Sequence, residues 1–210
     1  MYSKLVSYVK LSPNCNKPRN APIDRITIHC VVGQCTVESL GALFASPSRQ
    51  ASANYGIGSD GRIACYVEEE DRAWTSGSRE NDHRAITIEV ASDDTHPYAV
   101  KPEAYAALLD LVEDICRRHK LTLKYTGDTS GNMTMHKWFQ ATDCPGAYLE
   151  SKYPEIEKEV NKRLQGASEK DVFYRVQVGA FNVKDNAVAL RDKLHEQGYK
   201  DAFIVEVDRK

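Results

Sequence analysis

Two stretches of the chain share one pattern, Ile26-Thr27-Ile28-His29 and Ile86-Thr87-Ile88-Glu89. Isoleucine and threonine favour β-strands, and side chains along a strand point alternately to its two faces. The isoleucines therefore predict a core-facing side, while the opposite side carries His29 in one stretch and Glu89 in the other. In neighbouring strands of matching register, an imidazole and a carboxylate would share one surface. These stretches predict strands over Ile26–Val31 and Ala85–Val90.

Helical and extended patterns alternate around these two strands. Thr36 is the expected N-cap of a helix that ends at Ala45. A turn signal at 59–61 separates two short expected strands, Asn54–Gly58 and Arg62–Val67. The longest expected helix spans Lys101–His119, with an apolar stripe of Leu108, Leu109, Val112, Ile115 and Cys116. Strands interleaved with helices indicate an α/β layer fold.

The C-terminal part of the chain forms a second, smaller pattern. A helical pattern opened by Pro154 leads into the small and polar stretch 165–171, which predicts a linker between a domain over 1–164 and a unit over 172–210. We expect a β-α-β order there, with strands over Phe173–Phe181 and Ala202–Val207 and a helix over Lys184–Gln197, stopped by Gly198. Such a short unit rarely has a sufficient core, so we expect it to pack on another surface.

Composition excludes several classes of protein. The 210 residues are 41% hydrophobic, which suffices for one good core, and 28 basic residues against 30 acidic ones argue against a nucleic-acid-binding protein. No apolar run reaches the ~20 residues of a membrane span, and residues 1–8 lack the apolar segment of a classical signal peptide. We therefore expect a protein made in the cytoplasm, with its six cysteines mostly reduced.

The segment Met135–Gly146 adds a second histidine and a cysteine, His136 and Cys144. Neutral imidazoles and a thiolate are good zinc ligands, and three protein ligands with one open position are typical of catalytic zinc. Pro145 favours a helix start directly after Cys144, where the helix N-terminus would stabilise a thiolate. His29, His136 and Cys144 are therefore candidate ligands, although their spacing matches no local metal motif.

Other side chains compete with these candidates. Asp143 is the main local rival because it adjoins Cys144. Cys30 follows His29 on the same strand, so we expect it to point to the opposite face, into the core. Cys35 lies beyond a break in that strand. The remaining histidines are expected at the surface or at helix ends: His83, His96, His119 and His195.

The candidate residues stand in an order that resembles a known family. The pattern comprises His29 on a strand, Ser52-Ala53-Asn54-Tyr55, Ala73-Trp74, Ile86–Glu89, His136 and Ala141-Thr142-Asp143-Cys144-Pro145-Gly146. It resembles the type 2 zinc N-acetylmuramoyl-L-alanine amidases, relatives of peptidoglycan recognition proteins and of phage endolysins, over roughly 23–153. The resemblance implies a central mixed β-sheet flanked by helices, with Zn²⁺ at its edge held by His29, His136 and Cys144.

The resemblance also implies a reaction, hydrolysis of the amide between N-acetylmuramic acid and L-alanine in bacterial peptidoglycan. Glu89 matches the catalytic glutamate of one branch of the family, and Thr142 matches a position held by Lys or Thr. Zinc acidifies a water molecule, Glu89 would carry its proton to the leaving amine, and Thr142 would help to stabilise the oxyanion. Tyr55, Trp74 and Arg79 are the expected wall-contacting residues.

Some positions depart from the family pattern. Ala53 stands where some phage members have a tyrosine, which adds weight to Glu89, and Trp74-Thr75 replaces a Trp-His pair. Proteins of this fold that bind wall fragments without cutting them typically lack the cysteine ligand, so Cys144 favours an enzyme. Three alternatives stay open: a non-catalytic peptidoglycan-binding protein on the same fold, a different zinc amidohydrolase, and a protein without metal.

The tail resembles half of a sporulation-related repeat (SPOR) domain, a class that binds peptidoglycan glycan strands. The resemblance rests on Tyr174–Phe181 and the helix after it. A half domain leaves two alternatives, pairing of two chains into a homodimer or packing of the tail on the catalytic domain. With no export signal, the enzyme would act at the cell wall after release, as a phage endolysin or as a host autolysin or sporulation enzyme.

Overall fold

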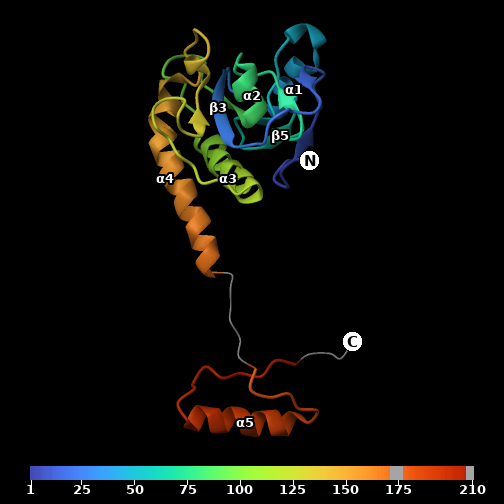
Figure 1. Ribbon diagram of the computed structural model, residues 1–210, viewed down its shortest axis with the longest axis vertical. Helices are drawn as coiled ribbons and strands as arrows, with labels where there is room; N and C mark the ends of the chain where they lie inside the picture. Colours follow the sequence, from blue (N-terminus) through green and yellow to red (C-terminus); the bar gives the residue numbers. More distant parts are fainter. Residues whose placement is uncertain (171–176, 207–210) are drawn as a thin grey trace. The chain divides into compact units, whose positions relative to one another are not determined.

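The computed structural model describes residues 1–170 and 177–206, without the side chains of 167–170. The chain divides into two compact units, Met1–Glu169 and Lys170–Lys210, which are described separately below. The strands are β1 (Tyr8–Val9), β2 (Cys15–Asn16), β3 (Arg25–Val32), β4 (Tyr55–Ile57), β5 (Ile63–Cys65), β6 (Arg72–Ala73), β7 (Ala85–Ser92) and β8 (Met133–Thr134). The helices are α1 (Val37–Ala45), α2 (Arg79–Arg84), α3 (Pro102–His119), α4 (Gly146–Lys170) and α5 (Lys184–Glu196), with short 3-10 helices at Pro47–Arg49 and His136–Trp138 (Figure 1).

A six-stranded sheet in the order β1-β5-β4-β7-β3-β8 forms the centre of the first unit. The β4–β5 pair is antiparallel, and the other pairs of this sheet are parallel. This confirms the α/β fold with a central mixed sheet, and β2 and β6 form a separate antiparallel pair. Strands β3 and β7 are neighbours in the register that aligns Thr27 with Thr87 and His29 with Glu89. The shared surface expected from the two sequence stretches is therefore present.

One face of the sheet is covered by α3 and α4. Ile28 and Ile88 are fully buried there, in one cluster with Leu108 of α3 and Leu149 of α4. The predicted apolar stripe of α3 is confirmed, since all five of its residues are buried. Burial of one such aliphatic side chain contributes about 1.5–3 kcal/mol. This apolar layer holds β3 and β7 in place from one face of the sheet.

The opposite face carries α1 and a layer of buried polar groups. α1 begins as predicted, with the Thr36 side chain accepting a hydrogen bond from the Ser39 amide. Thr27 Oγ1 lies 2.8 Å from Thr134 Oγ1, which joins β3 to β8, and the amide of Thr87 donates to Asn54 Oδ1 at 3.1 Å. These bonds tie β3 to β8 and β7 to Asn54 on the face of the sheet that carries His29 and Glu89.

α4 confirms one predicted helix start and corrects another. It begins at Gly146, directly after Pro145 as expected, so Pro154 lies inside the helix and does not open it. Buried Tyr153 anchors this part of the helix, because its hydroxyl donates to the carbonyls of Ile28 (3.1 Å) and Thr134 (2.9 Å). That anchoring on the sheet outweighs the backbone hydrogen bond that a proline removes. The helix also continues to Lys170, so most of the predicted linker 165–171 is helical.

The second unit contains the predicted helix. α5 is followed by Gly198 at φ +98°, which confirms the glycine stop. Residues 177–181 and 202–206 carry no strand, which corrects the strand predictions there, whereas 173–176 and 207 lie outside the described residues. Alternation is nevertheless present after α5: Ala202 and Ile204 are half-buried, and Phe203 and Val205 are exposed. The described contacts of 202–206 are with α5, through the ion pair between Lys184 and Glu206 and the hydrogen bond from His195 to the Ala202 carbonyl.

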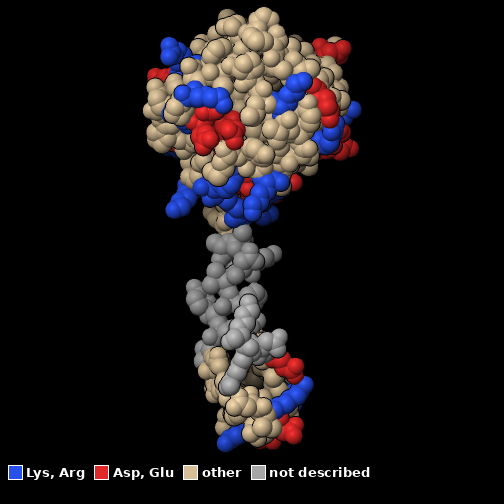
Figure 2. All heavy atoms as spheres, turned by 90° about the vertical axis from the view of Figure 1, so that its right-hand side faces the viewer, with Lys and Arg blue, Asp and Glu red and all other residues tan. Residues whose placement is uncertain are grey.

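Charge and hydropathy agree with the sequence analysis. Figure 2 shows acidic and basic side chains interspersed on the face of the first unit that it displays. No helix in the described part of the chain combines the length and the hydropathy needed to cross a membrane.

Candidate metal centre

His29, His136 and Cys144 come together at the edge of the sheet. One ligand atom from each of the three lies within 4.8 Å of the others. His29 is on β3, His136 begins the 3-10 helix after β8, and Cys144 directly precedes the turn into α4. In the described residues this is the one group of histidine, cysteine and acidic side chains with such spacing. The exposed Asp143, the local rival for Cys144, is not part of it.

His29 is held in the neutral form that binds metals. Its side chain is 1% exposed, and burial, together with the nearby His136, lowers its pKa to about 3. Its Nδ1 lies 3.4 Å from Cys144 Sγ and 4.0 Å from Glu89 Oε1. Since the ring is neutral at ordinary pH, the contact with Glu89 is not an ion pair. An imidazole of this kind offers a lone pair rather than a charge.

His136 is oriented by a residue that sequence reasoning missed. Gln140 Oε1 lies 3.0 Å from His136 Nε2, so Nε2 donates the hydrogen bond and Nδ1 keeps its lone pair. The rings of His29 and His136 are 5.0 Å apart. A hydrogen bond that fixes one ring nitrogen and frees the other is the usual support of a metal-binding histidine. The signal in the sequence for this contact is that Gln140 stands four residues after His136.

Two further groups of interest lie near Cys144. Its amide donates to the hydroxyl of exposed Thr142 at 3.3 Å, which places that hydroxyl beside the ligand cluster. The nearby thiol of Cys30 and burial raise the pKa of Cys144. Cys30 itself packs against the core, as expected, and is not part of the ligand cluster.

Glu89 faces the same cluster from β7. Its side chain is 16% exposed, and burial, together with the nearby Cys30, raises its pKa to about 8. The Oε2 atom of Glu89 and the Nε2 atom of His29 are buried without a hydrogen-bond partner in the described residues. A buried carboxyl group with a raised pKa and a free oxygen is a typical feature of a group that exchanges protons.

The donor set fits a zinc ion. Two imidazoles and one thiol are the ligand types that Zn²⁺ prefers, and three protein ligands leave one coordination position for another molecule. Burial disfavours negative charge on Cys144 and Glu89. In the described residues no cationic side chain bonds to either group to offset that cost. A divalent cation would offset that cost.

The predicted wall-contacting residues have two different outcomes. Tyr55 is fully buried on the central strand β4, where its hydroxyl bonds to Glu69 and accepts from the Ser3 amide, so the prediction that it contacts the wall is wrong. Trp74 is half-buried and donates from Nε1 to Asn16 Oδ1 at 2.7 Å. Arg79 is exposed at the start of α2, in a surface hollow that contains none of the candidate ligands. For Trp74 and Arg79 the role stays a prediction.

The histidines outside the cluster have structural surroundings. His83 and His119 lie in the last turns of α2 and α3, and His195 lies in the last turn of α5, which confirms the helix-end expectation for these three. His119 Nε2 bonds to the buried Glu69 at 2.8 Å. All six cysteines are free thiols.

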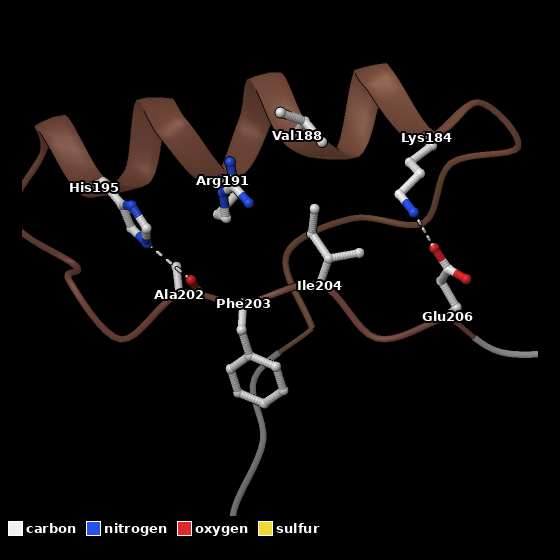
Figure 3. A pocket seen from close by; sticks show the side chains of 8 residues that line it. All are labelled: Lys184, Val188, Arg191, His195, Ala202, Phe203, Ile204 and Glu206. Carbon is white, nitrogen blue, oxygen red and sulfur yellow. Dashed lines mark hydrogen bonds and ion pairs between the residues drawn. The ribbon is translucent and has the colours of Figure 1, made fainter.

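The second unit has a hollow of its own, shown in Figure 3. It has a volume of about 490 Å³ and lies between α5 and residues 202–206. An ion pair between Lys184 and Glu206 (2.6 Å) and a hydrogen bond from His195 to the Ala202 carbonyl (2.8 Å) link its two sides. Ile204 points toward α5, whereas Phe203 points away from the helix (Figure 3).

Comparison with known families agrees with this geometry. Residues 19–147 match the N-acetylmuramoyl-L-alanine amidase family, and residues 162–210 match the SPOR domain. The first match covers more than half of the chain. The protein therefore belongs to the N-acetylmuramoyl-L-alanine amidase family, a class of peptidoglycan hydrolases, and carries a C-terminal SPOR domain.

Solved structures with the same fold include several amidases. An AmpD derivative is 20% identical, with a TM-score of 0.58 over 76% of this chain and 98% of that one. The Staphylococcus aureus hydrolase AmiA, in complex with its ligand, is 18% identical, with a TM-score of 0.58 over 81% and 84% of the two chains. A mutant endolysin from Bacillus subtilis is 18% identical, with a TM-score of 0.57 over 73% and 97%. At these identities the likeness shows a shared fold. No curated protein matches the sequence.

Proposed function

We propose that this protein is a zinc-dependent amidase that cuts the bond between N-acetylmuramic acid and the L-alanine of the stem peptide. The observation that carries the proposal is the cluster of His29, His136 and Cys144 beside the buried carboxyl group of Glu89. Family membership supports the bond type, and the donor set supports zinc.

The three ligands and the glutamate have separate roles in this proposal. His29, His136 and Cys144 would hold Zn²⁺, which when bound supplies a Lewis acid that acidifies water and polarises an amide carbonyl. Glu89 accepts the proton of the attacking water on a carboxylate oxygen and delivers it to the nitrogen of the leaving L-alanine. The Thr142 hydroxyl, held near Cys144, donates to the carbonyl oxygen as negative charge develops on it.

The rest of the chain would bring the wall to this site. Trp74 and Arg79 are the proposed contacts for the muropeptide, since both are accessible on the catalytic unit. The SPOR unit would bind glycan strands, and the match over 162–210 supports that role. Attachment to an insoluble polymer raises the local concentration of cleavable bonds near the catalytic unit.

Digestion of purified peptidoglycan tests the proposal. The full-length protein is incubated with cell walls, with and without a zinc chelator, and the soluble products are identified by mass spectrometry. Stem peptides that begin with L-alanine, released only when metal is present, are the expected result. Walls that bind the protein but release no peptide would favour the alternative, a non-catalytic peptidoglycan-binding protein.

The same digestion separates the remaining alternatives. Zinc bound in elemental analysis without any product from peptidoglycan would indicate an amidohydrolase with another substrate. The metal centre would be contradicted if protein purified without chelator contains no zinc and still binds none after zinc is added. An exposed histidine outside the cluster provides the control, since His195→Ala should bind zinc like the wild type whereas His136→Ala should not.

A further inference from the structure

Asn81 is a buried polar residue of α2 to which the proposed reaction gives no role. Its Nδ2 donates to Thr27 Oγ1 at 2.9 Å, and its Oδ1 accepts from Thr134 Oγ1 at 3.1 Å. The two threonine oxygens lie 2.8 Å apart. All three side chains belong to residues that are at most 1% exposed. The amide and the two hydroxyls therefore form a closed ring of three hydrogen bonds that joins α2, β3 and β8.

Each bond in this ring has a defined direction. Thr134 gives its one hydroxyl proton to Asn81, so its oxygen accepts from Thr27. The Thr27 oxygen in turn accepts from the Asn81 amide. Every member thus donates once and accepts once within the ring. A buried polar group that loses its partner is costly, so removal of one member also disturbs the other two.

The ring lies two residues before both candidate histidine ligands. His29 follows Thr27 on β3, and His136 follows Thr134 just beyond the end of β8. In the described residues, Thr27 and Thr134 are the last aligned pair of β3 and β8. The two imidazole rings are 5.0 Å apart. Their separation therefore depends on how the ring of hydrogen bonds holds the two strands.

Asn81 reaches a further segment with its second amide proton. Nδ2 also donates to Ser76 Oγ at 3.3 Å, and Ser76 Oγ donates to the buried carboxyl group of Asp82 at 2.6 Å. Asp82 accepts from the backbone amides of Thr75 and Ser76 as well, each at 3.1 Å. These bonds anchor α2 to the loop before it, which leaves the Asn81 amide little freedom to rotate.

We propose that Asn81 is a positioning residue, which sets the spacing of His29 and His136 by holding their two strands together. Because it is buried, it acts through the strands. The spacing is a property of the metal-free protein and does not depend on the proposed function. Only the consequence for zinc rests on that function: two imidazoles at the wrong separation do not both reach the bond length of about 2.0–2.1 Å that zinc requires.

Nuclear magnetic resonance of the metal-free, full-length protein with labelled histidines tests the spacing directly. In the wild type, the ring protons of His29 and His136 should show a mutual nuclear Overhauser effect, because the rings lie side by side. The variant His136→Ala identifies the signals. Asn81→Ala should abolish this effect or strongly reduce it.

Three threonine variants separate positioning from stability. Thr134→Val keeps the shape of the side chain but opens the ring, whereas Thr134→Ser keeps the hydroxyl. The first should lose the Overhauser effect and the second should retain it, and this pair decides the question if Asn81→Ala does not fold. Thr75→Val is the matched control, since Thr75 Oγ1 lies 2.8 Å from Thr87 Oγ1 in a similar pair that does not join β3 to β8. It should lower the melting temperature but leave the histidine signals unchanged.

Zinc affinity is the second readout, measured by competition with a chromogenic chelator. Asn81→Ala should weaken zinc binding by about 10-fold, the lower end of what residues outside the ligand set contribute. Thr75→Val should bind zinc like the wild type. Retention of the Overhauser effect in Asn81→Ala and Thr134→Val, or its absence from the wild type, would overturn the proposal. An effect that depends on Asn81 in a protein that binds no zinc would support the positioning and contradict the proposed metal centre instead.

Discussion

The two compact units use their apolar residues in opposite ways. In the catalytic unit, side chains such as Ile28 and Leu108 are fully buried between the sheet and its helices. In the C-terminal unit, α5 has no buried residue, and Tyr199 and Phe203 are each 65% exposed. The first unit buries its apolar side chains between its own elements, whereas these two apolar side chains of the second unit are exposed. The comparison indicates that chemistry resides on the self-sufficient unit and attachment on the other.

The largest expected effect tests the chemistry of the catalytic unit. Glu89→Gln removes the proposed proton acceptor but keeps the size of the side chain, so turnover on peptidoglycan should fall by about 10²–10⁴-fold. Zinc content, measured by elemental analysis, should stay the same because Glu89 is not a ligand. Glu80→Gln, at an exposed position of α2, is the control and should retain full turnover. Unchanged turnover in the Glu89 variant would exclude it as the base.

A core substitution sharpens the contrast in burial. Leu108→Ala leaves a cavity under the sheet and should lower the free energy of unfolding by about 2–5 kcal/mol. Denaturant titration followed by tryptophan fluorescence measures it, since Trp74 and Trp138 both belong to the catalytic unit. A loss below 1 kcal/mol would mean that this core is looser than its burial indicates.

Glu69 gives the catalytic unit a defined response to acid. Burial alone would raise its pKa, but hydrogen bonds from His119, Arg118 and Tyr55 outweigh burial and lower the pKa to about 2. A carboxyl group with a lowered folded-state pKa stabilises the fold above its ordinary pKa, near 4.5, and loses that contribution as the pH falls towards 2. The loss should be on the order of 3 kcal/mol.

Unfolding free energies measured between pH 6 and pH 2 in steps of about one unit check this prediction. The variant Glu69→Gln should be less stable at pH 6 and should lack most of the acid-dependent decline. Parallel curves for the variant and the wild type would place the acid sensitivity elsewhere.

The smallest expected effect concerns the exposed face of the C-terminal unit. Phe203→Ser should change the thermal unfolding of the catalytic unit by less than about 0.5 kcal/mol, since exposed positions contribute little. If two chains pair through this face, the same variant should lower the molar mass in light scattering from that of a dimer to that of a monomer. Ile204→Ser, on the side facing α5, is the comparison variant. If Phe203→Ser instead strongly destabilised the catalytic unit, the contrast in burial between the two units would not hold.

Sequence reasoning succeeded where periodicity and chemistry coincide. The repeated pattern at Ile26–His29 and Ile86–Glu89 predicted two strands, and their alignment in the sheet brings His29 to Glu89. The three candidate ligands also come together as the resemblance implied. Each of these residues has a side chain whose chemistry is distinctive enough to be recognised without coordinates.

Sequence reasoning failed where the surroundings of a side chain depend on residues far away in the sequence. Tyr55 lies on a strand buried on both faces, and its hydroxyl is used by Glu69 and Ser3, which no local pattern indicates. Pro154 does not open a helix as predicted, because Tyr153 anchors α4 across it through carbonyls of β3 and β8.

The order of strands in the sheet has a consequence for the timing of synthesis. β3 pairs with β7, about sixty residues later, and then with β8, which lies more than a hundred residues after it. Contacts of such long range form late, because the intervening chain must be made first. A ribosome that has released His29 has still to make Cys144 before the three ligands can meet. The nascent chain therefore cannot assemble the proposed metal centre until the last part of the catalytic unit has emerged, and the proposed activity would be withheld for that time.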